Sequence, residues 1–175
     1  MKNIFLILIL LSFTCSVSFA AGDLQVGDTA PDWSFSDSED QSFSMASWPN
    51  KVLLVSYVDP DESDVNESFN EALQAARKDG RLQDADYQGV GILDCKATWK
   101  PNKLIRVMAG KKAKKYKRTI LFDLDATLRG SWGLKKDSSN VILLDKNHVV
   151  KYISRGKIAD GEIASVIQMA IDLQK

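Results

Sequence analysis

Apolar residues change their spacing along residues 52–80. Residues 52–58 (VLLVSYV) form a nearly continuous apolar run rich in β-branched side chains, which is typical of a strand buried on both faces. Residues 63–78 then place apolar side chains at helical spacing, with basic residues at the end and Gly80 just beyond. The pattern therefore predicts a strand followed directly by a helix.

Similar units follow further along the chain. The remaining predicted elements are a strand, a helix, a strand, a hairpin and a helix, at residues 87–94, 102–115, 119–123, 141–153 and 160–173. The second helix carries apolar residues on one side: Leu104, Ile105, Val107 and Met108. Residues 22–50 are polar and rich in turns, and they predict an N-terminal hairpin. This order predicts an α/β protein with a thioredoxin-like, three-layer α/β/α fold, a mixed central sheet and an extra N-terminal β-hairpin.

The first twenty residues predict a cleavable signal peptide. Lys2 supplies a positive charge, residues 4–11 form an apolar core too short to span a bilayer, and small residues at 18 and 20 precede a cleavage site before Ala21. An alternative is a lipid anchor on Cys15, but residues 12–14 make a poor lipobox because Phe13 is bulky. We therefore expect export to the periplasm.

Residues 21–175 have the length of a single domain with a sizeable core. Basic and acidic residues are balanced at 23 each, and removal of Lys2 with the signal peptide leaves a net charge of −1. Because the charges balance, the protein has no overall positive potential that would attract nucleic acid. After removal of Cys15, Cys95 is the one cysteine left, so no intramolecular disulfide is expected.

Two segments resemble peroxiredoxin-like and redoxin domains: residues 27–37 (GDTAPDWSFSD) and 141–156 (VILLDKNHVVKYISRG). A more specific run, W-x-L-x-x-x-S-S-x-V-x-x-L-D-K at Trp132–Lys146, is similar to the YtfJ family of bacterial exported proteins, as are residues 66–72 and 87–88. This resemblance covers nearly the whole chain after the signal peptide. It implies a thioredoxin-like fold and a periplasmic location, and it implies no reaction.

In open α/β sheets, sites form outside the carboxyl ends of the parallel strands. Three segments should meet there: residues 59–66, 94–98 and 138–140. The residues expected to line a binding cleft are Asp59, Asp61, Asp64, Asn66, Asp94, Trp132, Ser138, Ser139 and Asn140. Trp132 fits either the core or a lid over the cleft.

Residues 59–66 (DPDESDVN) contain no cysteine, although disulfide exchange requires a thiol near a helix N-terminus. The resemblance to peroxiredoxin-like domains also implies where a peroxidatic cysteine and its activating arginine would lie. This chain has no cysteine at the first position, and the second position, near Ser139, is uncharged. We interpret the acids of this turn as helix caps. The alternative, a calcium loop, lacks the EF-hand spacing and glycine, so no metal and no cofactor are expected. The sequence predicts a non-catalytic binding or accessory protein whose partner is a periplasmic protein or peptide.

Cys95 supports an alternative function, a single-cysteine redox protein that pairs with a partner thiol. Against it, Asp94 opposes thiolate formation, and a half-buried cysteine acts as a small hydrophobe. His148, the only histidine, lies in or beside a hairpin turn with no nucleophile nearby, so no catalytic role is expected.

Residues 111–118 (KKAKKYKR) hold six basic residues in eight. They predict either a solvated helix end, where cations suit the helix dipole, or contact with an anionic lipid surface or an acidic protein.

Overall fold

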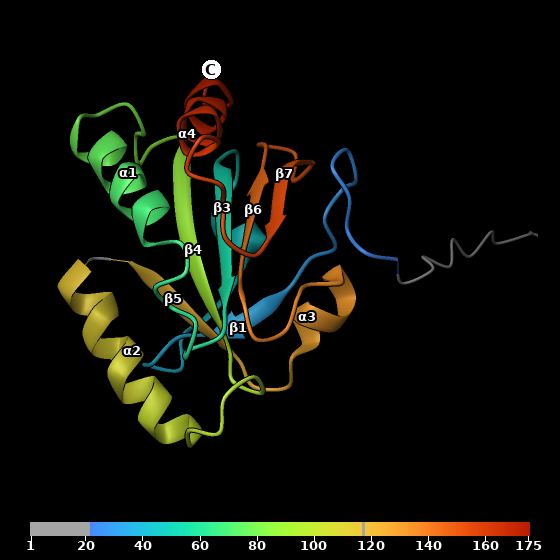
Figure 1. The fold of residues 1–175 in the computed structure, drawn as a ribbon, viewed down its shortest axis with the longest axis vertical. Helices are drawn as coiled ribbons and strands as arrows, with labels where there is room; N and C mark the ends of the chain where they lie inside the picture. Colours follow the sequence, from blue (N-terminus) through green and yellow to red (C-terminus); the bar gives the residue numbers. More distant parts are fainter. Residues whose placement is uncertain (1–21, 117) are drawn as a thin grey trace, which may run out of the picture.

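A seven-stranded mixed sheet forms the centre of the computed structural model, which describes residues 22–175 except residue 117 (Figure 1). The strands are β1 (Ser34–Ser36), β2 (Ser42–Ser44), β3 (Val52–Val58), β4 (Tyr87–Asp94), β5 (Thr119–Asp123), β6 (Ser139–Leu144) and β7 (Val150–Arg155). Their order is β2-β1-β5-β4-β3-β6-β7, with β3, β4 and β5 parallel and the other pairs antiparallel. The predicted mixed sheet and N-terminal hairpin are confirmed, whereas the predicted signal peptide lies outside the described residues.

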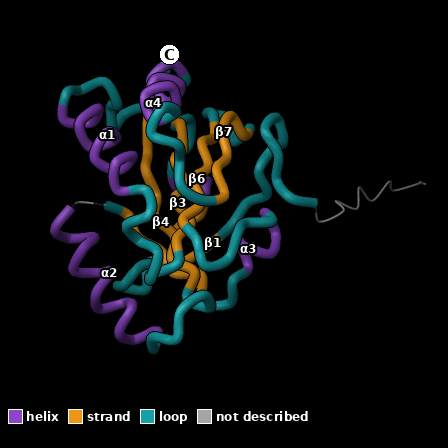
Figure 2. The backbone as a smooth tube through the Cα atoms, viewed as in Figure 1, coloured by secondary structure: helices purple, strands orange, loops and turns teal. Residues whose placement is uncertain are grey.

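Helices cover both faces of the sheet (Figure 2). They are α1 (Glu67–Lys78), α2 (Asn102–Tyr116), α3 (Thr127–Trp132) and α4 (Ile163–Asp172), with one 3₁₀ turn at Met45–Ser47. Helices α1 and α4 pack together against the face of the sheet that carries Leu54 and Leu143. The opposite face, which carries Val55 and Ile142, is covered by α3 and the N-terminal segment. This arrangement confirms the three-layer α/β/α prediction.

The central strands match their predicted bounds, because apolar residues fill both faces of each. The two hairpin strands are predicted at residues 141–145 and 148–153, and both begin elsewhere in the structure. β6 begins at Ser139 because Ser139 and Asn140 pair with Val58 and Tyr57 of β3. β7 begins at Val150 because His148 adopts a left-handed turn conformation, with φ of 62°, that ends the strand ladder.

The start of α1 was predicted four residues too early. Backbone hydrogen bonds from Glu62 to Asp59 and from Val65 to Glu62 form successive turns across residues 60–66, and the helix begins only at Glu67. Helix α3 was not predicted at all. It has six residues and is capped by Gly133, whose left-handed φ of 58° lets its N–H donate back to the carbonyl of Arg129.

Helix α2 does not bury the apolar side that the sequence predicted. Ile105 is buried together with Ala109, and both pack against Phe122 of β5. The other three apolar residues of that predicted side are exposed: Leu104, Val107 and Met108. The helix therefore has two apolar surfaces, one inside and one outside. Within the described residues, no helix has the length and apolar character needed to cross a bilayer.

Candidate functional site

The three segments predicted to form the site do meet at the carboxyl ends of β3 and β4. The backbone N–H of Asp59 donates to the carbonyl of Ser138 at 3.0 Å, which joins the loop after β3 to the start of β6. Asp61 accepts a hydrogen bond from Thr98 and forms an ion pair with Lys100, both in the loop after β4. Side chains from separate regions of the chain thus surround the carboxyl ends of these two strands.

Asn66 is buried and holds three of these segments together. Its Nδ2 donates to the Ser139 carbonyl at 3.3 Å and to the Gly156 carbonyl at 3.1 Å, while its Oδ1 accepts the N–H of Ile158 at 2.8 Å. The amide is therefore fully occupied by the protein. Asn66 acts as a structural clamp between α1, β6 and the segment after β7.

Asn140 is a second structural clamp, on β6. It is completely buried, and its Nδ2 donates to the carbonyls of Tyr57 at 3.2 Å and Lys135 at 2.9 Å. Its Oδ1 accepts the N–H of Lys135 at 2.9 Å. Asn140 therefore holds the loop before β6 against β3 and has no free hydrogen-bonding group to offer a ligand.

Asp94 ends β4 with a buried carboxylate that is paired twice. It forms an ion pair with Arg129 of α3 and accepts the N–H of Lys96 at 3.0 Å. Arg129 is a site residue that the sequence does not predict. Its partner is 35 positions away in the chain, and no local pattern indicates the contact.

A second buried carboxylate, Asp123 at the end of β5, was also missed. It accepts the Tyr57 hydroxyl at 3.0 Å and the N–H groups of Thr127 and Leu128, each at 2.9 Å. Burial and the neighbouring Asp123 and Asp94 carboxylates raise the pKa of Tyr57 far above its ordinary value. A sequence signal did exist for Asp123, because an aspartate ahead of an LRGSW segment can hold the start of a helix.

Asp59, like Asp123, is a buried carboxylate with no cation bound directly to it among the described residues. Its Oδ1 accepts the N–H of Asp61 at 2.8 Å. Burial raises its pKa, as do the negative charges of Asp137, Glu62 and Asp94, while Lys100 opposes the shift. Asp59 therefore lies in a negative local potential.

The interpretation of the acidic turn as helix caps is wrong. Asn66 occupies the cap position of α1 without a side-chain cap hydrogen bond, and Glu67 is the acid in the first turn. Asp61 instead bridges to the loop after β4, and Asp64 is exposed. Because the helix begins late, the turn forms a surface loop beside the sheet edge.

Cys95 lies just beyond β4, with only 5% of its surface exposed. It packs among Ile105, Ala109 and Phe122, under helix α2. Burial raises the pKa of its thiol to about 11, and the carboxylates of Asp123 and Asp94 act in the same direction. At pH 7 only about one thiol in ten thousand is ionised, so the reactive thiolate is scarce as well as covered.

The last predicted site residues lie beneath the surface. Ser138 and Ser139 are buried at the start of β6, and Trp132 is fully buried on α3, where its Nε1 donates to the Pro31 carbonyl at 3.1 Å. Trp132 therefore belongs to the core and does not form a lid. Within residues 22–116 and 118–175, no three His, Cys, Asp or Glu side chains gather in a way that could hold a metal ion.

The site is thus a network of buried polar side chains bonded to one another and to the backbone. Asp94, Asp123, Asn66 and Asn140 each stabilise a loop. The exposed groups above them come from the loops: Asp61, Asp64 and Asp137, which we call the strand-end surface. Carboxylates held this way can recognise a partner, and the arrangement places no exposed nucleophile among them.

Comparisons with known proteins agree with this description. The family described as "Bacterial protein of unknown function (YtfJ_HI0045)" matches residues 32–173. An uncharacterised protein of Haemophilus influenzae is 35% identical over 66 residues, which is 38% of this chain. The chain matches 35% of that relative's length, about a third.

Solved structures of redox proteins share the fold. The thioredoxin domain of a thiol-disulfide oxidoreductase from Bacteroides vulgatus is similar with a TM-score of 0.65 and 14% identity, over 85% of this chain and 99% of that one. Peroxidoxin BcpB from Mycobacterium tuberculosis is similar with a TM-score of 0.62 and 12% identity, over 85% and 97%. At such identities the likeness establishes the thioredoxin-like fold and nothing about activity. With its central sheet and site inside the matched range, the chain belongs to the YtfJ family of bacterial proteins of unknown function.

Proposed function

We propose that the protein is an exported, non-catalytic binding or accessory protein of the periplasm that uses a thioredoxin-like scaffold to hold a protein or peptide partner. The observation that carries this proposal is the state of the polar groups at the carboxyl ends of the strands. Asn66, Asn140 and Asp94 are bonded internally, and Cys95 is buried with a raised pKa. Because these side chains are already bonded within the protein or buried, they can hold the loops of a binding surface in place but are not free to take part in a reaction.

The partner is expected to contact the strand-end surface. Asp61, Asp64 and Asp137 are held on loops that the buried amides anchor, so the surface is preorganised, which lowers the entropy lost on binding. The negative charges that raise the pKa of Asp59 favour a basic group on the partner.

The alternative function, thiol redox chemistry through Cys95, has no structural observation in its favour. The thiol would have to leave its apolar surroundings under α2 before it could meet a partner's sulfur.

Export to the periplasm is supported by the composition of residues 1–20. Sequencing the N-terminus of the periplasmic form should give Ala21, and an intact Met1 in the cytoplasmic fraction would count against export.

One pair of measurements tests the absence of catalysis. The mature protein and its Cys95→Ser variant are compared for peroxide consumption and for reduction of insulin disulfides. We expect both proteins to be equally inactive. Activity in the wild type that the variant loses would overturn the proposal in favour of the redox alternative.

A second experiment tests the binding surface. A photo-crosslinking amino acid replaces Asp64 or Asp137, and a matched control replaces Asn147, an exposed residue in the β6–β7 turn at the other end of the sheet. We expect a specific adduct from the first two positions and none from the third. With the purified partner, the D64N/D137N double variant should bind roughly tenfold more weakly.

A further inference from the structure

Helix α2 carries an apolar surface that the fold does not use. Leu104, Val107 and Met108 are 47%, 50% and 50% exposed, and their spacing places them on one face of the helix. Ile105 and Ala109 form the inward face of the helix and pack against the sheet. The outward residues therefore contribute little to the stability of the domain.

Trp99 is a further exposed apolar side chain, in the loop that leads into the helix. It lies three residues before Asn102, the first residue of α2, and is 87% exposed. Exposing an indole ring to water forgoes a large burial energy, and tryptophan is enriched where an apolar phase meets a polar one. Four large apolar side chains in ten residues thus face solvent: Trp99, Leu104, Val107 and Met108.

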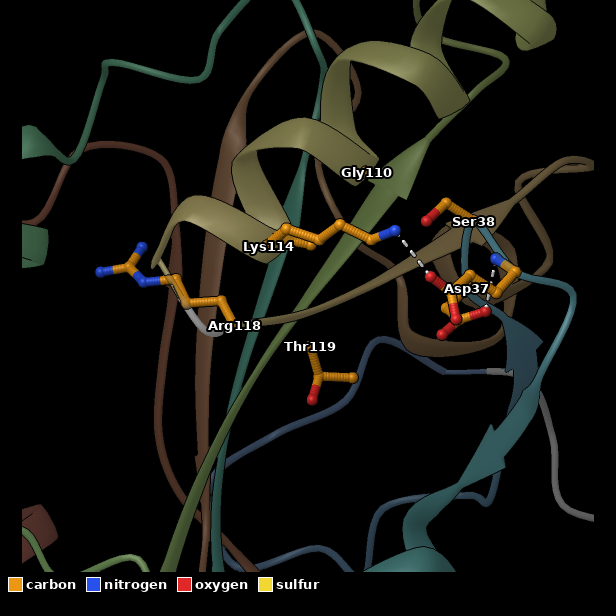
Figure 3. Close-up of a pocket in the computed structure, with 8 residues that line it drawn as sticks. Asp37, Ser38, Gly110, Lys114, Arg118 and Thr119 are labelled. Carbon is orange, nitrogen blue, oxygen red and sulfur yellow. Dashed lines mark hydrogen bonds and ion pairs between the residues drawn. The ribbon is translucent and has the colours of Figure 1, made fainter.

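The same helix is strongly basic. Residues 102–116 contain six lysine or arginine residues and no acid. Two of these cations are held by the β1–β2 turn, since Arg106 pairs with Asp40 at 2.6 Å and Lys114 with Glu39 at 2.9 Å. Figure 3 shows Lys114 reaching across a surface pocket towards this turn.

Three lysines of α2 are not neutralised in this way. Lys103, Lys111 and Lys112 are exposed, and none has an ion-pair partner among the residues whose side chains are described. At helical spacing, Lys103 and Lys111 are neighbours of Val107, and Lys112 is a neighbour of Met108. Cations therefore border the apolar residues on the outward face.

We propose that this α2 surface, made of Trp99, Leu104, Val107 and Met108 with Lys103, Lys111 and Lys112, docks on an anionic phospholipid bilayer. The apolar side chains enter the headgroup boundary while the ammonium groups pair with lipid phosphates. Because the balance of charged residues leaves almost no net charge, the attraction comes from this face rather than from the whole molecule.

A bilayer fits this surface better than a protein partner does. The pocket beside this helix is lined by Gly110, Ala113 and Lys114 and by none of the exposed apolar residues. Apolar side chains on one exposed helix face, bordered by lysines, match the fluid headgroup region, which adapts to any outline. The surface adjoins the strand-end surface at Trp99, whose neighbours Thr98 and Lys100 both bond to Asp61. It shares no residue with that surface, so this proposal does not depend on the proposed function.

Vesicle binding by the mature protein tests the proposal. Vesicles of phosphatidylcholine are compared with equimolar phosphatidylcholine and phosphatidylglycerol, by co-sedimentation and by tryptophan emission. We expect binding to the anionic vesicles only, a blue shift of Trp99, and weaker binding as salt rises. The K103Q/K111Q/K112Q variant should bind roughly 100-fold more weakly, at about fivefold per lysine.

Two further variants separate this mechanism from a general charge effect. The matched control K78Q/K157Q/K175Q removes three exposed lysines from other elements and should change binding by less than roughly twofold. The W99S/L104S variant keeps the charge and should bind at least roughly tenfold more weakly. Urea unfolding checks that every variant is folded.

Several outcomes would overturn the proposal. These are no binding to anionic vesicles, an equal loss in the control variant, or full binding by W99S/L104S. Self-association of the protein, or binding to an acidic protein, through these residues in the absence of any vesicle binding would assign the surface to a protein contact instead.

Discussion

The hydroxyl of Tyr57 donates a 3.0 Å hydrogen bond to Asp123 and so joins β3 to β5 across the intervening strand β4. Asp123 also accepts the first free N–H groups of α3. Because burial and nearby carboxylates raise the pKa of Tyr57, the hydroxyl keeps its proton throughout the usual pH range. The pair links the edge of the sheet to α3.

We predict that Tyr57→Phe lowers the free energy of unfolding by about 1.5–3 kcal/mol, the value of a hydrogen bond to a charged group. Urea unfolding gives this difference. In a double-mutant cycle with Asp123→Asn, the two changes should be non-additive because they remove one shared interaction. Tyr87→Phe is the control, at a buried tyrosine whose hydroxyl has no hydrogen-bond partner among the described residues. Equal losses in the two Tyr→Phe variants would show that the Asp123 contact has no special value.

The central strands could be predicted because their residues carry the signal themselves. In residues 52–58, 87–94 and 119–123, apolar side chains on both faces demand a buried strand, whatever surrounds them. Helix α2 shows the limit of the same argument. Its apolar pattern predicted the position of the helix. The pattern places Leu104 and Ile105 next to each other, however, and it does not show that Ile105 faces inward and Leu104 outward.

The sequence predicted where the site lies but not the roles of its residues. The topology rule brought residues 59–66, 94–98 and 138–140 to one edge, as the structure has them. The roles depend on partners far away in the chain: Asn66 bonds to Gly156, 90 positions on, and Tyr57 to Asp123, 66 positions on. No local pattern encodes such pairs, so polar residues that proved to be clamps were expected to line a cleft.

We predict that Arg129→Met destabilises the protein strongly, by about 3–5 kcal/mol, because it leaves the buried Asp94 carboxylate without its cation. Adding Asp94→Asn should recover some of the loss. Lys96→Met is the matched control, since Lys96 and Asp125 form an exposed pair at 3.9 Å whose removal should cost less than about 1 kcal/mol. Thermal and urea unfolding measure all three. A small effect in Arg129→Met would mean that water solvates Asp94 in place of the arginine.

We predict that Cys95 resists alkylation in the folded protein. At pH 8, iodoacetamide should modify it at least roughly a hundredfold more slowly than in urea, because the pKa of about 11 and the cover of α2 both limit the thiolate. Mass spectrometry follows the reaction, and an unfolded peptide of residues 90–100 is the control. Equal rates would show that the thiol is open to solvent and would revive the redox alternative.

The same thiol makes stability depend on pH in the alkaline range. Its pKa is raised from 9.0 in the unfolded chain to about 11 in the folded protein, so the unfolded state releases the proton first. Stability is therefore full below pH 9 and falls by up to about 3 kcal/mol as pH rises towards 11. Cys95→Ala should lack this loss, and a decline of the same size in that variant would assign it to other groups.

Asp59 gives a second test of the pH dependence of stability, at acid pH. Its pKa is raised, so the folded protein binds a proton more tightly than the unfolded chain does, and ionisation above that pKa costs stability. We predict that Asp59→Asn raises the Tm at pH 7 by about 2–4 °C, since the amide keeps an oxygen for the Asp61 N–H and removes a buried charge. The difference should vanish below the ordinary value of 3.8, where both states are protonated. Asp64→Asn, at an exposed position of the same loop, should change the Tm little at either pH. A lower Tm for Asp59→Asn at pH 7 would mean that its carboxylate is a stabilising partner rather than an isolated buried charge.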